Sequence, residues 1–371
     1  MLLRAMRKKR SFIPETLSDA DLPRITVVVP TYNEEAIIGA MLQNVLKVDY
    51  PVERMEILVV DSASKDRTRE VIEGFLGDKR VRLISESRRG WNLAVRLACQ
   101  EAKGDVIVLS GADVFYRPDA LRRMCVHFAS HEVGAVTGRQ VLLNQNESFA
   151  TEMEGKYRKW QYFVTEAESL IDQPFDVKGE MIAARKPIIT SVLERIGDTA
   201  TVDTCIPLET RAQGYRLSYE PEAMYTESAA LAAGERLHSQ IRRGRNLIEC
   251  TFHYLWMLWR PQYGIFGMLI FPYHFAWLAL FPWVFFASIV CSLVATFYYP
   301  VCALLFLLAA VALTRKEWRV FVSSFLMGQT ALAIGLLLCA RKAPAIERID
   351  STRKSSLEKF PSKAVPSVLS V

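Results

Sequence analysis

The sequence predicts an α/β domain, with a mostly parallel sheet and helices on both faces, followed by membrane helices. Two patterns support this prediction. Between residues 24 and 110, short β-branched runs alternate with segments of helical spacing, which is typical of a parallel sheet covered by helices. Residues 264–340 are dense in Phe, Leu, Val, Ala and Trp, whereas the first two-thirds of the 371-residue chain resembles an ordinary soluble protein.

The elements of the first domain follow from the spacing of apolar residues. Buried strands are expected at 24–30, 55–61, 81–85 and 105–110. Helices are expected at 33–47, 66–75 and 91–102, and, in the less regular part, near 151–170 and 203–213. Residues 1–22 are expected to form a basic arm, so the domain itself would run from 23 to 235.

The C-terminal third predicts contact with a membrane. Residues 236–262 carry arginines among apolar and aromatic residues, which indicates an amphipathic helix at the membrane surface; a buried helix of the domain is the alternative. Residues 264–313 are long enough for two spans. The segment 319–340 has basic residues on both flanks, so it would span, lie at the interface or re-enter.

The region 263–342 would therefore hold two or three membrane segments, before a disordered tail at 343–371. The basic clusters near the apolar region place the first domain in the cytoplasm of an integral membrane protein.

Charge and cysteine content exclude other classes. The formal net charge is only +6, and no basic stripe with interleaved aromatics occurs in the soluble part, so a nucleic-acid partner is not expected. The seven cysteines form no CxxC pair, which fits a reduced setting and argues against a disulfide framework.

Polar residues follow the predicted strands, where ligands of parallel sheets bind. The first strand leads into Pro30, Thr31, Tyr32, Asn33 and Glu34. Asp61 ends the second strand and could accept a hydrogen bond from a nucleotide base, or cap the loop that follows it. Asp113 follows the fourth strand and could bind Mg²⁺ or Mn²⁺, or close a turn.

Two further sites lie later in the chain. Asp203 could be a general base or the N-terminal cap of a helix, and from the residues alone the cap is favoured. Gln240 and Arg243 lie in a Gln-Ile-Arg-Arg-Gly segment, whose guanidinium groups suit phosphate, from a substrate or from lipid headgroups.

Taken together, these motifs resemble the family-2 glycosyltransferases, especially the membrane-integrated branch with hyaluronan, chitin and cellulose synthases. The likeness spans roughly residues 24–340, in the same order and at similar spacing. It implies a nucleotide pocket lined by Pro30, Thr31, Tyr32, Glu34, Asp61, Arg89, Ala112, Gln240 and Arg243. It also implies that Asp113 is the metal ligand and that Asp203, with Gly214 and Tyr215 beyond it, is the general base.

Four positions depart from the family pattern. Trp91 stands where Lys is usual, Gly111 replaces the first Asp of the metal motif, Val202 replaces a Glu, and Gly244 replaces a Trp that packs against the acceptor sugar. The changes at 111 and 244 weaken the case for a processive polymer synthase.

The resemblance implies a GT-A type domain, a divalent cation (Mg²⁺ or Mn²⁺) and an inverting transfer from a nucleotide diphosphate sugar, with a UDP-sugar favoured. The acceptor would be lipid-linked or a glycan, next to membrane lipids, and an oligomer is possible. The alternatives are a processive polysaccharide synthase and a catalytically inactive nucleotide-sugar-binding membrane protein. A nucleotidyltransferase is disfavoured, because no Gly-rich phosphate loop follows the first strand.

Overall fold

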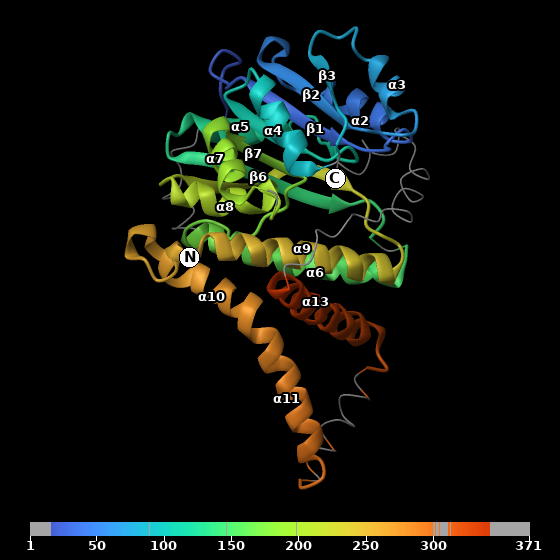
Figure 1. Ribbon diagram of the computed structural model, residues 1–371, viewed down its shortest axis with the longest axis vertical. Coiled ribbons are helices and arrows are strands. Elements are labelled where there is room, and N and C mark those ends of the chain that lie inside the picture. Colours follow the sequence, from blue (N-terminus) through green and yellow to red (C-terminus); the bar gives the residue numbers. More distant parts are fainter. Residues whose placement is uncertain are drawn as a thin grey trace.

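The computed structural model describes residues 16–88, 90–145, 147–197, 199–299, 301, 304, 311 and 313–341 (Figure 1). Its centre is an eight-stranded sheet in the order β3-β2-β1-β4-β7-β6-β8-β5. The strands are β1 (Ile25–Thr31), β2 (Met55–Ser62), β3 (Val81–Glu86), β4 (Val106–Ser110), β5 (Phe115–Tyr116), β6 (Val133–Leu142), β7 (Met181–Arg185) and β8 (Arg216–Glu227).

The sheet is parallel through β3, β2, β1 and β4, and mixed beyond them. Strand β7 runs antiparallel to both β4 and β6, so its amino end lies beside the carboxyl end of β4, where Ser110 pairs with Met181. Strand β8 pairs in parallel with β6, and its last residue, Glu227, lies opposite Leu142. The carboxyl ends of β1, β2, β4 and β8 and the amino end of β7 therefore share one edge.

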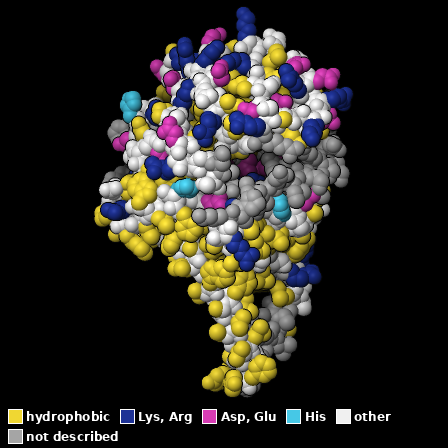
Figure 2. Space-filling model, in the orientation of Figure 1, with side chains coloured by type: hydrophobic (Ala, Val, Ile, Leu, Met, Phe, Trp, Pro, Cys, Tyr) yellow, Lys and Arg dark blue, Asp and Glu magenta, His cyan; other side chains and the backbone are white. Residues whose placement is uncertain are grey.

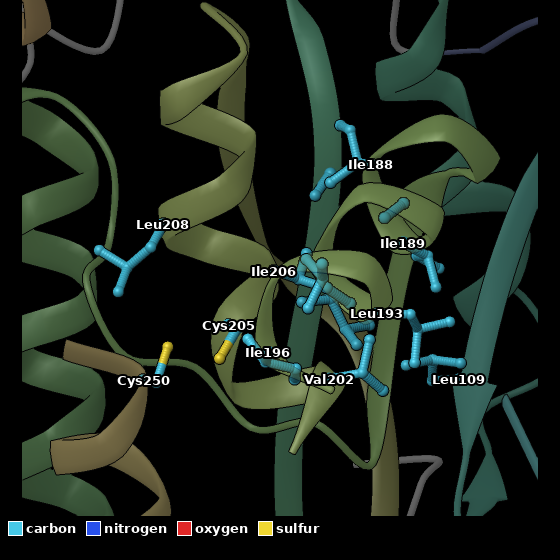
Figure 3. Close-up of a cluster of buried hydrophobic side chains, with 14 of the residues drawn as sticks. Leu109, Ile188, Ile189, Leu193, Ile196, Val202, Cys205, Ile206, Leu208 and Cys250 are labelled. Atoms are coloured by element: carbon cyan, nitrogen blue, oxygen red, sulfur yellow. The ribbon is translucent and has the colours of Figure 1, made fainter. Parts of the chain in front are cut away.

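Helices cover both faces of the sheet, as predicted. They are α2 (Ile38–Val45), α3 (Thr68–Glu73), α4 (Trp91–Glu101), α5 (Ala120–Val126), α6 (Phe149–Ile171), α7 (Lys186–Ile196), α8 (Val202–Ala212) and α9 (Ala233–His253). Because side chains alternate along a strand, Val27 and Val29 pack with α2 and α5, whereas Val28 packs with α4 and α7. Figure 3 shows part of the core on the Val28 side of the sheet, where Leu109 lies beside residues of α7 and α8.

A long apolar helical run follows the domain. It comprises η5 (Phe266–Ile270), α10 (Phe271–Phe275), η6 (Ala276–Leu280) and α11 (Phe281–Ala295), after the short turns η3 (Leu255–Met257) and η4 (Pro261–Tyr263). The two π-helical turns, η5 and η6, come just before Pro272 and Pro282. Proline has no N–H for the regular helical bond, so the wider turns are explained by the two prolines.

The last described helix, α13 (Lys316–Ala340), packs against α9 and α6, whereas α10 and α11 extend away from the domain (Figure 1). Its contact with α9 is close because two glycines meet: a Cβ at Gly335 would lie 3.1 Å from the backbone N of Arg245 and 3.5 Å from the carbonyl carbon of Gly244. Within the described residues, two helices, Phe266–Ala295 and Lys316–Ala340, are long and apolar enough to cross a membrane.

Some boundaries differ from the sequence predictions. The helix predicted at 33–47 begins only at Ile38, because Asn33 is in the left-handed region with φ of 53° and cannot continue a helix. The predicted arm at 1–22 is described only from residue 16, and Leu22 is already fully buried in the core. The second span predicted within 264–313 and the tail at 343–371 lie largely outside the described residues.

Candidate active site

The loops after β1 and β2 are bound to each other at the predicted nucleotide edge. Thr31 and Asp61 are paired in register at the ends of their strands. The backbone N–H of Asn33 donates to Ser64 Oγ at 2.9 Å, and Asn33 Oδ1 accepts from the N–H of Lys65 at 2.8 Å. These bonds hold the left-handed conformation of Asn33, so the segment Pro30–Glu34 has a fixed shape.

Asp61 caps its own loop, as the alternative interpretation expected. Its Oδ1 accepts from the backbone N–H of Ser64 at 3.3 Å and from the Ser64 hydroxyl at 2.5 Å. The side chain is buried at the same edge as Thr31. Contact with a nucleotide base stays a prediction for Asp61, and Arg89, in the next loop, lies outside the described residues.

Asp113 lies just beyond β4 and is buried beside Gly111 and Ala112. A Cβ at Gly111 would lie 2.8 Å from Asp113 Oδ1, so the departure at this position leaves space that the Asp113 carboxylate uses. Glu227, at the end of β8, lies near Asp113, because Phe115 pairs with Thr226 in the sheet. Burial, together with the charges of Glu180 and Asp113, raises the pKa of Glu227 well above its ordinary range.

Asp203 lies in the first turn of α8, and the cap prediction is wrong, because Thr201 is the N-terminal cap residue. The carboxylate packs on Gly179, where a Cβ would lie 2.5 Å from both Cβ and Cγ of Asp203. Burial, and next the negative charge of Glu180, raise the pKa of Asp203 above its ordinary value. A raised pKa is the property that a carboxylate base needs near neutral pH.

Asn92 fixes the loop that leads into α8. Its Nδ2 donates to the carbonyls of Gly197 at 3.0 Å and Ala200 at 2.7 Å, and its Oδ1 accepts from the N–H of Val202 at 3.1 Å. The side chain is buried, so all three bonds are shielded from water. Asn92 therefore connects the start of α4 to the residue before Asp203.

Helices α6 and α9 close the site with a set of paired charges. Arg243 Nη2 lies 3.5 Å from Glu180 Oε1, and Arg243 Nη1 lies 3.6 Å from Glu154 Oε1. Glu154 also pairs with Arg158 at 2.8 Å and with Arg236 at 3.2 Å. Burial raises the pKa of Glu180, but the charges of Arg243, Arg158 and Lys178 outweigh it and lower the pKa to about 2.

A pocket opens between this charged set and the end of β8. Its walls are Gln140, Leu142, Glu154, Arg158, Glu227, Ser228, Ala229, Ala230, Arg236, Ser239, Gln240, Arg242 and Arg243. The buried Oε1 of Gln240 has no hydrogen-bond partner among the described residues. Both predicted residues of α9, Gln240 and Arg243, therefore line one pocket with Glu227.

The structure thus links the two predicted acidic residues. Glu227 lies near Asp113, because Phe115 pairs with Thr226, and Glu180 precedes Met181, which pairs with Ser110 at the same edge. Asp203 packs on Gly179, next to Glu180, and Arg243 Nη2 lies 3.5 Å from Glu180 Oε1. The four carboxylates therefore gather at one edge of the sheet with Arg243 among them. Glu180 and Glu227 were not predicted from the sequence as members of this set. The signal that was present for Glu227 is its place at the carboxyl end of a strand.

Comparison with known proteins agrees with this geometry. Residues 26–190 match the family described as Glycosyl transferase family 2. The chain carries a family 2 glycosyltransferase domain. This confirms the family that the motifs predicted, and the matched residues include β1, β2, β4 and β7, which position Asp61 and Asp113.

Two curated relatives match parts of this domain. The beta-monoglucosyldiacylglycerol synthase of Synechocystis is 31% identical over 142 residues, which cover 37% of this chain and 30% of the relative. The poly-beta-1,6-N-acetyl-D-glucosamine synthase of Staphylococcus aureus is 26% identical over 206 residues, covering 55% of this chain and 50% of the relative. The chain thus spans at most half of the length of these relatives.

A solved structure matches over most of the chain. The mannosyltransferase PcManGT from Pyrobaculum calidifontis, in complex with GDP-Man and Mn²⁺, has a TM-score of 0.74 and 23% identity, covering 92% of this chain and 94% of that one. The similarity confirms the predicted GT-A type fold of the family 2 glycosyltransferase domain.

Proposed function

We propose that this chain is a membrane-bound inverting glycosyltransferase, which moves a sugar from a nucleotide diphosphate donor to a lipid-linked or glycan acceptor. One observation carries the proposal. Asp113 and Asp203, from separate parts of the chain, lie at the one edge of the sheet where ligands of such folds bind. Asp113 follows β4, and Asp203 packs on Gly179, two residues before Met181 of β7, which pairs with Ser110 of β4. The family 2 domain supports the reaction class.

The donor would lie along the edge from Asp61 to Asp113. The fixed loop at Pro30–Glu34 and the Asp61 carboxylate would hold the base and ribose, and the diphosphate would reach towards Arg243. The P. calidifontis enzyme binds GDP-Man, and a UDP-sugar is our preferred donor for this chain from its resemblance to the polymer synthases. Guanidinium groups suit phosphate because they can form two parallel bonds to it.

A divalent cation, Mg²⁺ or Mn²⁺, would neutralise the departing diphosphate when it is bound. Asp113 would hold it, with Glu227 nearby. Across the described ranges, no three His, Cys, Asp or Glu side chains form a metal cluster. Mg²⁺ usually takes only one or two carboxylates and completes its shell with substrate phosphates and water, so the carboxylate pair fits such an ion.

Asp203 would act as the general base. It would take the proton from the acceptor hydroxyl while the acceptor oxygen bonds to the anomeric carbon and the bond from that carbon to the diphosphate breaks. The cluster around Glu180 would hold Asp203 in place, and Arg243 would stabilise the negative charge on the leaving group. Positioning of the two substrates in line would provide much of the rate.

We favour a lipid-linked or short glycan acceptor over a growing polymer. The relatives' names include both a glycolipid synthase and a polysaccharide synthase, so they leave both classes open. Two described helices that could cross a membrane are few for an export channel within one chain. Sizing the products made from labelled donor tests this preference, and a polymer ladder would overturn it.

The proposal as a whole is tested with purified full-length protein, nucleotide diphosphate sugars and Mn²⁺ or Mg²⁺. Donor binding is measured by thermal shift and transfer by labelled product. Asp203→Asn is expected to keep donor binding and to lose transfer by at least about 10²-fold. Asp113→Ala is expected to lose the dependence on the cation.

Asp21→Asn, at an exposed surface position, is the matched control and should behave as the wild type. If transfer were unaffected by changes at both 113 and 203, the assigned roles would be wrong. Donor binding without any transfer by the wild type would instead support an inactive nucleotide-sugar-binding protein.

A further inference from the structure

Helix α6 has two faces of opposite character. Its inner face carries Glu154 and Arg158 into the active-site pocket. Its outer face carries large apolar side chains in the open: Trp160 is 58% exposed, Phe163 is 63% exposed, and their rings lie 5.7 Å apart. Ile171, on the same side two turns later, is 44% exposed. Such a cluster on one helix face is typical of an interaction surface.

Neighbouring helices contact α6 near its two ends and leave this outer face open. At the start of α6, Lys316 Nζ of α13 donates to Glu152 Oε1 at 2.6 Å, and Ser324 Oγ donates to the Met153 carbonyl at 3.3 Å. Near its end, His274 of α10 lies 2.5 Å from Glu168. The open face thus lies between the two helices that are long and apolar enough to cross a membrane.

Basic residues accompany the aromatic ones. Lys156 and Lys159 are both exposed on α6. Around the helix, Lys156 lies between Trp160 and Phe163, where its Nζ also donates to the Glu317 carbonyl at 3.2 Å, and Lys159 lies beside Phe163. Long cationic side chains beside exposed aromatics are the pattern of a helix lying in the interface of a bilayer, with the rings at the headgroup level and the ammonium groups on anionic lipids.

The helix that the sequence predicted for this role is placed differently. Helix α9 lies between the domain and α13, and the Gly244–Gly335 contact closes the space on that side. Arg236 and Arg245 are buried there, in ion pairs with Glu154 and Glu249. Much of the arginine charge of α9 is therefore used within the protein.

We propose that the outer face of α6, formed by Lys156, Lys159, Trp160, Phe163 and Ile171 and called here the α6 strip, rests in the interfacial layer of a bilayer containing anionic lipids. The strip belongs to the end of the molecule where α13 packs and from which α10 and α11 extend (Figure 1). Figure 2 shows hydrophobic side chains gathered over that end and over the helices below it, whereas charged side chains gather over the sheet domain.

This inference goes beyond the proposed reaction and does not depend on it. It gives the surface that orients the domain on the membrane: α6 is the wall between the lipid headgroups and the pocket that contains Glu154 and Arg158. The competing occupant is a second copy of this chain, which would cover the strip with protein.

The test uses the full chain in vesicles of phosphatidylcholine and phosphatidylglycerol, with lipids brominated near the headgroup end of their acyl chains. The emission of Trp160 is taken as the difference between the wild type and Trp160→Phe. We expect the brominated lipids to quench this difference, and iodide in the water to quench it little. Trp283→Phe, in α11, and Trp91→Phe, in the sheet domain, give the matched quenched and unquenched references.

A charge variant adds a second measurement. Lys159→Glu should reduce the lipid quenching of Trp160 in vesicles that contain phosphatidylglycerol and leave it unchanged in pure phosphatidylcholine. Quenching of Trp160 by iodide alone would overturn the proposal, because it would place the strip in water. Protection from both quenchers would overturn it as well, because the strip would then be covered by a second copy.

Discussion

Replacing Gly179 with alanine is expected to displace the Asp203 carboxylate. A Cβ at position 179 would lie 2.5 Å from both Cβ and Cγ of Asp203, and nearer still to Oδ2. Carbon atoms in contact prefer about 3.5 Å or more, so the two segments must move apart by about 1 Å. Rotation of the carboxylate cannot relieve the clash, because the Cβ of Asp203 is itself one of the atoms in contact.

The size of the effect follows from this displacement. A misplacement of about 1 Å in a catalytic group costs on the order of 10²-fold in rate, which corresponds to about 3 kcal/mol of activation free energy. The loss should appear in kcat, because Asp203 would act on the acceptor proton during the reaction. The KM for the donor should change little, because the loops at Asn33 and Ser64 are bound to each other at the other end of the site.

The assay is transfer of labelled sugar at saturating donor, with circular dichroism to verify the fold. Gly77→Ala is the matched control, because a Cβ at Gly77 would meet no atom within 4 Å. An unchanged kcat in a folded Gly179→Ala protein would refute the reasoning. An equal loss in Gly77→Ala would show that the effect is not specific to the contact with Asp203.

Four further predictions concern Asp203, the loop before it and the packing of α13. Asn92→Ala removes three buried hydrogen bonds and should lower the free energy of unfolding by about 2–4 kcal/mol, measured by denaturant titration. Asn92→Asp should also be destabilised, because its carboxylate cannot donate to the carbonyls of the loop. Because the pKa of Asp203 is raised, kcat should fall as the pH decreases through a pKa above that of an ordinary aspartate. Glu180→Gln removes a neighbouring negative charge and should move this acidic limb of the pH–kcat profile to lower pH. If the limb stays in place, Glu180 is not a cause of the raised pKa. The same raised pKa favours the folded state at low pH and loses that contribution as pH rises, so Asp203→Asn should gain stability at neutral pH. Gly335→Leu should separate α13 from α9 and lower the melting temperature, since its side chain would overlap the backbone of Arg245.

The first half of the site could be predicted because it follows a simple rule. Strands β1, β2 and β4 are parallel neighbours, so their carboxyl ends meet, and the residues just after them had to lie together. Thr31, Asp61 and Asp113 are where that rule placed them. These strands are nearly continuous apolar runs rather than alternating ones, because they are buried on both faces.

The second half could not be predicted in the same way. Strand β7 is antiparallel to its neighbours, so the residue before it, Glu180, lies at the active edge, whereas the rule selects residues after strands. Glu227 does end a strand, but β8 pairs with β6, some eighty residues earlier, across a segment without regular alternation. Asp203 needed the family resemblance, because the spacing alone favoured a helix cap.

The replacement of the family's Trp by Gly244 is physically connected to the close approach of α13 to α9. In the family pattern this position is a Trp that packs against the acceptor sugar. Here a Cβ at Gly244 would already lie 3.3 Å from Leu332 of α13, and Gly335 brings the two helix backbones together at the same point. A tryptophan at 244 would push α13 away from α9, so the helix contact and the aromatic platform exclude each other. A chain that uses this position for helix packing has no such platform on α9, which is consistent with our preference for a single transfer over processive extension.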